Sequence, residues 1–248
     1  MRGNESLTVF FPVYNDENTV ERVTLKAIKV CESLTSDYEV IIVNDGSPDD
    51  SGLIADELAA RYPAVSVIHH DRNRGYGAAV RTGLAASTKK WICFTDGDDE
   101  YDLHDLAKLW RLRVHYPLVI TFRFVRRYSS SRVVISRVYN SVLRRLFRIR
   151  YRDISTGLRL VDRSVIERLL LQSNSPFIGA EITIKTMLMG YPVGEVGIQT
   201  FPREFGRGGS TSVKNILLTI SDMASAYRGI FSRDYGLPEG GSRAMRPG

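Results

Sequence analysis

The chain carries, directly after an apolar run, the acidic sequence Cys93-Phe94-Thr95-Asp96-Gly97-Asp98-Asp99-Glu100. Apolar residues followed at once by clustered carboxylates indicate a buried strand that ends at an acidic loop. Carboxylates this close repel one another, which costs stability unless a cation lies among them. A hard divalent cation such as Mg²⁺ or Mn²⁺, shared with the phosphates of a ligand, meets this need. The alternative is a solvated acidic turn.

Strand and helix patterns alternate around this run. They predict strands at residues 7–13, 38–43, 65–69 and 91–95, with helices at 18–34, 51–61 and 77–87. This alternation predicts an α/β fold with a mostly parallel, Rossmann-like central sheet that is flanked by helices. Such sheets bind ligands at the carboxyl ends of their strands, where the polar runs 12–17, 44–50 and 96–100 lie.

The second half of the chain is less regular. It predicts helices at residues 103–113, 133–149, 162–171, 179–189 and 213–231, and a strand at 118–124. Residues 232–248 are rich in Gly and Pro, which is typical of a flexible tail. We therefore expect a single domain over residues 1–231.

Composition is that of an ordinary globular protein, with 43% hydrophobic and 25% charged residues. The two cysteines, Cys31 and Cys93, are too few and too scattered for a disulfide framework, so we expect buried, reduced thiols in the cytoplasm. The polar first residues lead directly into a strand, and we expect no signal peptide. No apolar run approaches the ~20 residues that would span a bilayer.

The net charge of +6 conceals a local basic region. Residues 106–152 contain no Asp or Glu, but they hold thirteen Lys and Arg residues, more than the whole positive excess. A basic region implies an anionic partner such as phospholipid, a phosphorylated substrate or nucleic acid. Nucleic acid is the poorer interpretation, because no recognition motif accompanies the basic run.

The helix predicted at residues 133–149 fits an amphipathic helix at an anionic membrane surface. Its apolar side is predicted to hold Ile135, Val138, Tyr139, Val142, Leu146 and Ile149. The residues expected to contact membrane or lipid phosphate are Arg132, Arg137, Arg144, Arg145 and Arg148. The helix at 213–231 is a second candidate. The alternative is that both apolar faces pack on the core, which we favour for the later helix.

Polar motifs follow the first two strands. In Pro12-Val13-Tyr14-Asn15-Asp16, Tyr14 offers a ring on which a base can lie, and Asp16 can accept a hydrogen bond from a base or ribose. In Val43-Asn44-Asp45-Gly46-Ser47, Asp45 can accept a hydrogen bond from a base N–H. The alternative for both is an ordinary turn that caps a helix.

The sequence Asn73-Arg74-Gly75-Tyr76-Gly77 places two glycines at the start of a helix, where backbone can approach a nucleotide. It lacks the third glycine of the dinucleotide fingerprint, and no glycine follows the first strand. A nicotinamide-dependent Rossmann enzyme is therefore disfavoured. A nucleotidyltransferase is disfavoured as well, since no glycine-rich, arginine-containing loop follows the first strand.

Taken in this order, the motifs resemble those of family 2 glycosyltransferases of the GT-A fold, and most of all the polyprenyl-phosphate sugar synthases of the dolichyl-phosphate mannose and glucose group. The resemblance covers roughly residues 7–212. Asp16 stands where that family has Glu in P-x-Y-N-E, and Asn44 replaces the first Asp of V-D-D-G-S. Asp96-Gly97-Asp98 matches the D-A-D motif that binds nucleotide sugar and metal.

Downstream, residues 153–160 resemble the D-x-x-S-G-F-R-L motif near the acceptor site of the family, and Arg123 falls at the arginine of G-S-R. Arg203 begins a sequence like R-x-x-G-x-S that is two residues longer. The resemblance implies that the part from about residue 123 onward faces the acceptor and the membrane. The implied nucleotide-sugar contacts are Pro12, Tyr14, Asn15, Asp16, Val43, Asp45, Asn73, Gly77, Asp96, Gly97, Asp98, Arg123 and Arg203.

The resemblance also implies a mechanism. A hexose would be transferred with inversion from GDP-mannose or UDP-glucose, or a related donor, to polyprenyl phosphate. Asp98 and Glu100 would bind Mg²⁺ or Mn²⁺, with Arg203 or Arg123 assisting departure of the diphosphate. The implied catalytic residues are Asp98, Asp153 and Arg203. A lipid phosphate needs no deprotonation, whereas for a hydroxyl acceptor Asp153 is the first candidate for the general base. The alternative for Asp153 is a structural role, in which it caps the following helix or pairs with Arg152 or Arg159.

Two other functions stay open from the sequence. One is transfer to a soluble hydroxyl acceptor, as in polysaccharide or natural-product glycosylation. The other is a catalytically silent subunit that binds a membrane, which the intact Asp96 and Asp98 argue against. For the enzyme that acts on lipid we expect a cytoplasmic protein that associates peripherally with the membrane.

Overall fold

The computed structural model describes residues 5–125, 130–201 and 212–231. Seven strands form one sheet in the order β3-β2-β1-β4-β6-β5-β7. The strands are β1 (Leu7–Val13), β2 (Tyr38–Asn44), β3 (Val65–His69), β4 (Trp91–Phe94), β5 (Leu118–Val125), β6 (Arg159–Asp162) and β7 (Val193–Gln199). All neighbouring pairs are parallel except β4–β6 and β5–β6, so that β6 alone runs against the sheet. The predicted α/β fold with a mostly parallel sheet is confirmed.

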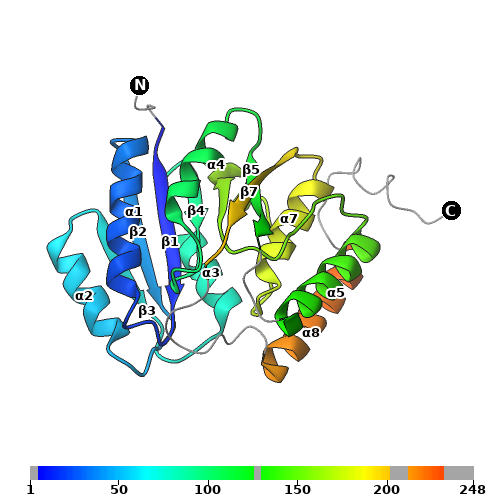
Figure 1. The fold of residues 1–248 in the computed structure, drawn as a ribbon, viewed down its shortest axis with the longest axis horizontal. Helices are drawn as coiled ribbons and strands as arrows, with labels where there is room; N and C mark the ends of the chain where they lie inside the picture. Colours follow the sequence, from blue (N-terminus) through cyan, green and yellow to red (C-terminus); the bar gives the residue numbers. More distant parts are fainter. Residues whose placement is uncertain (1–4, 126–129, 202–211, 232–248) are drawn as a thin grey trace.

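Helices cover both faces of this sheet (Figure 1). They are α1 (Val20–Leu34), α2 (Ser51–Arg61), α3 (Tyr76–Ala86), the 3-10 helix η1 (Leu103–Asp105), α4 (Leu106–Leu112), α5 (Ser130–Phe147), α6 (Arg163–Ile166), α7 (Ile178–Leu188) and α8 (Val213–Phe231). One apolar cluster joins α1, α2 and α4 to alternate strand residues such as Val9 and Phe11. A second cluster joins α3, α5 and α7 to Phe10 and Phe94 on the other face.

The first half of the chain follows the predicted alternation of strands and helices, because β1, β2 and β4 are largely buried and therefore form almost continuous apolar runs. Cys31 and Cys93 are free and buried, as predicted. The thiol of Cys31 has its pKa raised to about 12, chiefly by burial.

Two strands in the second half were not predicted. Residues 162–171 were expected to form one helix, but Asp162 ends β6 and only the short α6 follows. The strand β7 was also missed, since its sequence contains Gly194 and Gly197. Tyr116 and Phe122 pack where side chains on these two glycines would stand.

The helices α5 and α8 lie side by side at one end of the molecule (Figure 1). The rings of Phe147 and Tyr227 join them, with centroids 5.9 Å apart. Asp222 on α8 accepts hydrogen bonds from the backbone N–H groups of Asn174 and Ser175, which fixes α8 to the loop before α7. Among the described residues, no helix has the length and apolar character that crossing a bilayer requires. The predicted flexible tail, residues 232–248, lies outside the described residues.

Candidate active site

The acidic loop after β4 packs directly on the loop after β1. The hydroxyl of Thr19 donates a 2.8 Å hydrogen bond to the carbonyl of Gly97. A Cβ atom on Gly97 would stand 2.6 Å from the carbonyl oxygen of Pro12, so only glycine permits this approach. The two motifs that the sequence predicted to bind nucleotide are therefore neighbours at the carboxyl edge of the sheet.

Asp96 lies where three segments meet. The hydroxyl of Tyr76, the first residue of α3, donates a 2.6 Å hydrogen bond to Oδ1 of Asp96. On the other side, a Cβ on Gly157 would stand 2.5 Å from Oδ2 of the same carboxylate. Burial, together with the adjacent Asp96 charge, raises the pKa of Tyr76 well above its usual value, so Tyr76 stays a neutral donor.

Asp98 and Glu100 are the buried carboxylates of the acidic loop, with 7% and 6% of their surface exposed. The backbone N–H of Glu100 donates to Oδ1 of Asp98, and the carbonyl of Glu100 accepts from the N–H of Phe201 just after β7. Hard carboxylate oxygens of this kind suit Mg²⁺ or Mn²⁺.

The described residues contain no group of three or more Asp, Glu, His or Cys side chains that could hold a metal alone. Mg²⁺ is commonly held by one or two carboxylates together with substrate phosphates, so Asp98 and Glu100 fit a metal that arrives with a diphosphate.

The neighbouring Asp99 has a different role. Its carboxylate forms ion pairs with Arg22 and Lys26 of α1, at 2.7 and 2.8 Å. Its backbone adopts φ +59°, a left-handed conformation that is uncommon outside glycine and in which Asp and Asn are enriched. The two cations compensate one of the four clustered carboxylates and fix the loop to α1. The sequence had no signal for this pairing, because 73 residues separate Lys26 from Asp99.

Asp45 is buried at the end of β2 and already accepts several hydrogen bonds. Oδ1 accepts from Nδ1 of His70 at 2.6 Å and from the N–H of Arg74 at 2.8 Å, and Oδ2 accepts from the N–H of Gly75 at 2.9 Å. These bonds join the end of β2 to the loop that leads into α3. In this structure Asp45 therefore joins two of the loops that were predicted to bind nucleotide, and its contact with a base stays a prediction.

The loop after β1 is held by hydroxyl groups near the start of α2. Asn15, at φ +58°, donates its N–H to Ser47, and Asp16 donates its N–H to Ser51. Tyr14 in this loop is 42% exposed, which leaves room for a base to stack on its ring.

The glycines at the start of α3 take part in internal packing. A Cβ on Gly77 would stand 2.6 Å from the carbonyl carbon of Asn174, and the N–H of Gly77 donates to the Asn174 carbonyl. The close backbone approach at Gly77 is thus to the loop before α7. The exposed Asn73 lies at the entrance to α3.

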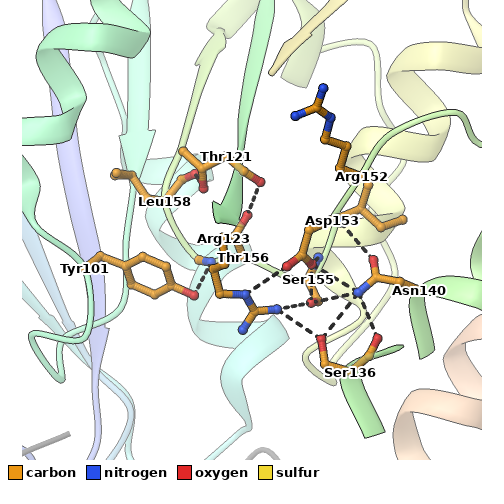
Figure 2. Close-up of polar contacts among 12 residues, drawn as sticks. Tyr101, Thr121, Arg123, Ser136, Asn140, Arg152, Asp153, Ser155, Thr156 and Leu158 are labelled. Atoms are coloured by element: carbon orange, nitrogen blue, oxygen red, sulfur yellow. Dashed lines mark hydrogen bonds and ion pairs between the residues drawn. The ribbon is translucent and has the colours of Figure 1, made fainter. Parts of the chain in front are cut away.

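Arg123, whose side chain is 11% exposed, forms an ion pair with the buried Asp153 (Figure 2). Nε of Arg123 donates to Oδ2 of Asp153 at 2.8 Å, and a second guanidinium nitrogen donates to the hydroxyls of Ser155 and Ser136. Oδ1 of Asp153 accepts from Ser155 and from the side-chain amide of Asn140. The sequence had suggested Arg152 or Arg159 as the structural partner of Asp153, and the ion-pair partner is instead Arg123.

The environment of Asp153 keeps it ionised. Burial alone would raise the pKa of this carboxyl, but the Arg123 guanidinium and the donors of Ser155 hold the pKa below its usual value. A carboxylate with a lowered pKa and both oxygens engaged is a weak proton acceptor. The arrangement therefore suits Asp153 to orienting Arg123.

Arg159 belongs to the motif at residues 153–160, and the sequence analysis did not predict that this arginine is buried. It is 1% exposed, and its guanidinium donates to the carbonyls of Ile154, Thr156 and Gly179 and to the hydroxyl of Thr183. Burial lowers its pKa. These bonds fix the loop that carries Asp153 against α7. An arginine between Leu158 and Leu160 in an apolar run was the available signal.

The helix α5 presents two different sides. Toward the core it buries Asn140, Leu143 and Phe147, and Ile149 just beyond the helix is buried as well. Its other side exposes apolar residues, namely Val134, Ile135, Val138, Val142 and Leu146. The residues predicted to form one apolar side therefore lie in different environments: Ile149 belongs to the core and Tyr139 is half-buried, whereas the others are exposed.

Arg137, Arg144 and Arg145 are exposed on α5, and Arg148 is exposed just after the end of the helix. The side chain of Arg132 and the whole of Arg203 lie outside the described residues. On α8, Val213, Leu217, Leu218 and Ile220 are exposed. The later helix thus also presents apolar residues that do not pack on the core.

Comparison with known proteins agrees with this architecture. Crystal structures of glucosyl-3-phosphoglycerate synthase from Mycobacterium tuberculosis match the fold with a TM-score of 0.70 at 18% identity, over 95% of this chain and 81% of theirs. One holds Mn²⁺, UDP and glucosyl-3-phosphoglycerate, and another, with a TM-score of 0.66, holds Mg²⁺ and UDP. The fold is therefore that of GT-A glycosyltransferases.

The sequence profile described as Glycosyl transferase family 2 matches residues 8–170. The chain belongs to this family, and it is a glycosyltransferase. It is 27% identical to polyprenol monophosphomannose synthase of Mycolicibacterium smegmatis, over 83% of this chain and 81% of that protein.

Two further relatives are longer than this chain. Glycosyltransferase AglD of Haloferax volcanii is 29% identical, over 84% of this chain and 34% of its own length. Undecaprenyl-phosphate 4-deoxy-4-formamido-L-arabinose transferase of Sodalis glossinidius is 27% identical, over 82% of this chain and 62% of its own length. The name of the Mycolicibacterium smegmatis relative refers to polyprenol, and that of the Sodalis glossinidius relative refers to undecaprenyl phosphate.

Proposed function

We propose that this protein transfers a hexose, with inversion, from a nucleotide sugar to polyprenyl phosphate at a membrane surface. The observation that carries the proposal is the double role of α5. Its inner side holds the Arg123–Asp153 pair through Ser136 and Asn140. Its outer side exposes an apolar stripe flanked by arginines. An enzyme that takes an anionic lipid from a bilayer needs both features in one place.

The donor is proposed to bind across the carboxyl ends of β1, β2 and β4. Tyr14 would stack on the base, while Asp16 and Asp45 would accept from base or ribose. Further contacts would come from Pro12, Asn15, Val43, Asn73, Gly77, Asp96 and Gly97. Asp98 and Glu100 would hold Mg²⁺ or Mn²⁺, which would neutralise charge on the departing diphosphate when bound. GDP-mannose and UDP-glucose represent the two proposed classes of donor, the guanosine-diphosphate sugars and the uridine-diphosphate sugars.

The acceptor side is proposed to contain Arg123. A phosphate oxygen is already an anion, so it can attack the anomeric carbon without a general base. Asp153 would then act by keeping the Arg123 guanidinium in place, since both of its oxygens accept hydrogen bonds within the protein. Arg203, which the resemblance assigns to the diphosphate, would complete the donor side.

Attachment to the membrane is proposed to be peripheral and to involve α5 and α8. Each Lys or Arg close to an anionic bilayer contributes on the order of 1 kcal/mol. The three exposed arginines on α5, Arg148 just after its end and the apolar residues beside them would therefore hold the protein reversibly at the lipid surface.

The test is transfer from labelled GDP-mannose and UDP-glucose to polyprenyl phosphate in mixed vesicles with Mn²⁺. We expect an organic-extractable product that disappears with EDTA and with Asp98→Ala, while Glu57→Gln on exposed α2 leaves it unchanged. Near wild-type transfer by Asp98→Ala would contradict the proposed metal site. Turnover of donor without lipid product would favour a soluble acceptor.

A further inference from the structure

A buried amide lies in the middle of the arginine-rich helix. Asn140 of α5 is 3% exposed. Its Nδ2 donates to Oδ1 of Asp153 at 3.1 Å and to the carbonyl of Ser136 at 2.9 Å, and its Oδ1 accepts from the N–H of Ile154 at 3.0 Å. Asparagine is a poor helix former, and an amide is costly to bury without partners. The three bonds account for its presence at this position.

These bonds set the orientation of the Asp153 carboxylate (Figure 2). Asn140 and Ser155 donate to Oδ1, which leaves Oδ2 directed at Nε of Arg123. One turn earlier on the same helix, the hydroxyl of Ser136 accepts from the Arg123 guanidinium at 3.2 Å. Within α5, Asn140 therefore holds Asp153 and Ser136 holds Arg123.

We propose that Asn140 is a positioning residue for the reaction, which acts by fixing the Asp153 carboxylate and, through it, the Arg123 guanidinium. The inference rests on the proposed function only in assigning Arg123 to the acceptor. Asn140 itself needs no contact with donor or acceptor. Its side chain makes α5 part of the active site as well as the outer surface of the protein.

The first test compares Asn140→Ala with Ser141→Ala, an exposed neighbour on the same helix. A displacement of about 1 Å at a reacting group can reduce the rate by about 100-fold. We expect Asn140→Ala to lower kcat/KM for the acceptor by about 10- to 100-fold and to leave KM for the donor within about twofold. Ser141→Ala should match the wild type. Equal effects on donor and acceptor parameters would overturn the inference.

A second variant separates positioning from simple loss of packing. Asn140→Asp keeps the size of the side chain and an acceptor for Ile154, but it places a second carboxylate beside Asp153. Two carboxylates this close do not both ionise easily, and a shared proton can restore the bond between them. The charged and titratable groups around the pair are Arg123 from β5, Tyr139 from α5 and Arg159 from β6.

The activity of Asn140→Asp relative to wild type should therefore rise as the pH falls from about 8.5 to about 6. A purely structural defect would give a ratio that does not depend on pH, and that result would contradict the inference. Measuring the ratio at each pH removes the pH dependence that both proteins share.

A readout that needs no substrate completes the test. In protein labelled with ¹⁵N-arginine, Nε–H of Arg123 should exchange slowly with water in the wild type and in Ser141→Ala, and rapidly in Asn140→Ala. Unchanged exchange in Asn140→Ala would overturn the inference. If the wild type instead transfers sugar to a different acceptor, the proposed lipid acceptor fails, while the exchange result still decides the role of Asn140.

Discussion

The hydroxyl of Tyr76 donates a 2.6 Å hydrogen bond to Oδ1 of Asp96, and this bond joins the first residue of α3 to the acidic loop after β4. The bond fixes the first carboxylate of the Asp96-Gly97-Asp98 motif before any ligand binds. Neither partner can be read from local sequence, because 20 residues and the strand β4 separate them.

Replacing Tyr76 with Phe removes this donor and keeps the ring. We expect KM for the nucleotide sugar to rise several-fold and the protein to lose about 1.5–3 kcal/mol of unfolding free energy, the usual net contribution of a hydrogen bond to a charged group. Steady-state kinetics and urea titration measure the two effects. Tyr62→Phe, near the end of α2, is the matched control and should change neither.

Gly157 packs against the opposite side of Asp96. A methyl group at this position would stand 2.5 Å from Oδ2, so Gly157→Ala must move either the carboxylate or the loop that carries Asp153. We expect at least a tenfold loss of kcat/KM, by the order of magnitude that small displacements cause. Gly190→Ala has no atom within 4 Å of its added methyl, and its cost should come only from its backbone at φ +82°. Full activity of Gly157→Ala would contradict the proposed role of Asp96.

The ion pair between Arg123 and Asp153 predicts a defined dependence of stability on pH. Because the pKa of Asp153 is lowered in the folded state, its contribution is fully present above the usual Asp value of 3.8 and is lost as the pH falls through the lower, folded value. Asp153→Asn should cost about 3–5 kcal/mol near neutral pH, because it leaves a buried guanidinium without its counter-charge.

The measurement is urea unfolding of wild type and Asp153→Asn at several pH values. The difference between the two proteins should be constant at neutral pH and should shrink below about pH 4. A difference that grows as the pH falls would show that the carboxyl is protonated in the folded protein.

The outer side of α5 predicts membrane binding that depends on charge. Replacing Arg144, Arg145 and Arg148 with Gln should weaken binding to anionic vesicles by one to two orders of magnitude, because each arginine near the surface contributes on the order of 1 kcal/mol. Turnover of a short, water-soluble polyprenyl phosphate should be kept. Co-sedimentation with anionic and neutral vesicles measures the effect. Replacing Arg61, Arg81 and Arg168, which lie outside α5, should leave binding unchanged.

The sequence analysis predicted the first half of the fold well, because β1, β2 and β4 are almost continuous apolar runs that end at polar turns. It missed β6 since this strand is four residues long and includes the buried Arg159. It missed β7 because small residues at Gly194 and Gly197 weaken the strand signal. The predicted helix over 133–149 was confirmed as α5, although its burial differs from the prediction.

The site could be predicted only in part. Motifs at strand ends identified the loops that contain Asp45 and Asp96, since a parallel sheet brings such ends together. The hydrogen-bond and ion-pair partners of the site residues come from distant segments. Arg123, the ion-pair partner of Asp153, lies 30 residues from it in the sequence. Tertiary packing alone brings these side chains together, and sequence periodicity carries no information about it.

The most direct test of the account compares polyprenyl phosphate with the corresponding polyprenol as acceptors, in the same vesicles, with the same donor and Mn²⁺. The engaged Asp153 carboxylate is a poor general base, so the account predicts product from the phosphate and none from the free alcohol. Efficient transfer to the alcohol, or to a soluble sugar hydroxyl in place of the lipid phosphate, would contradict it.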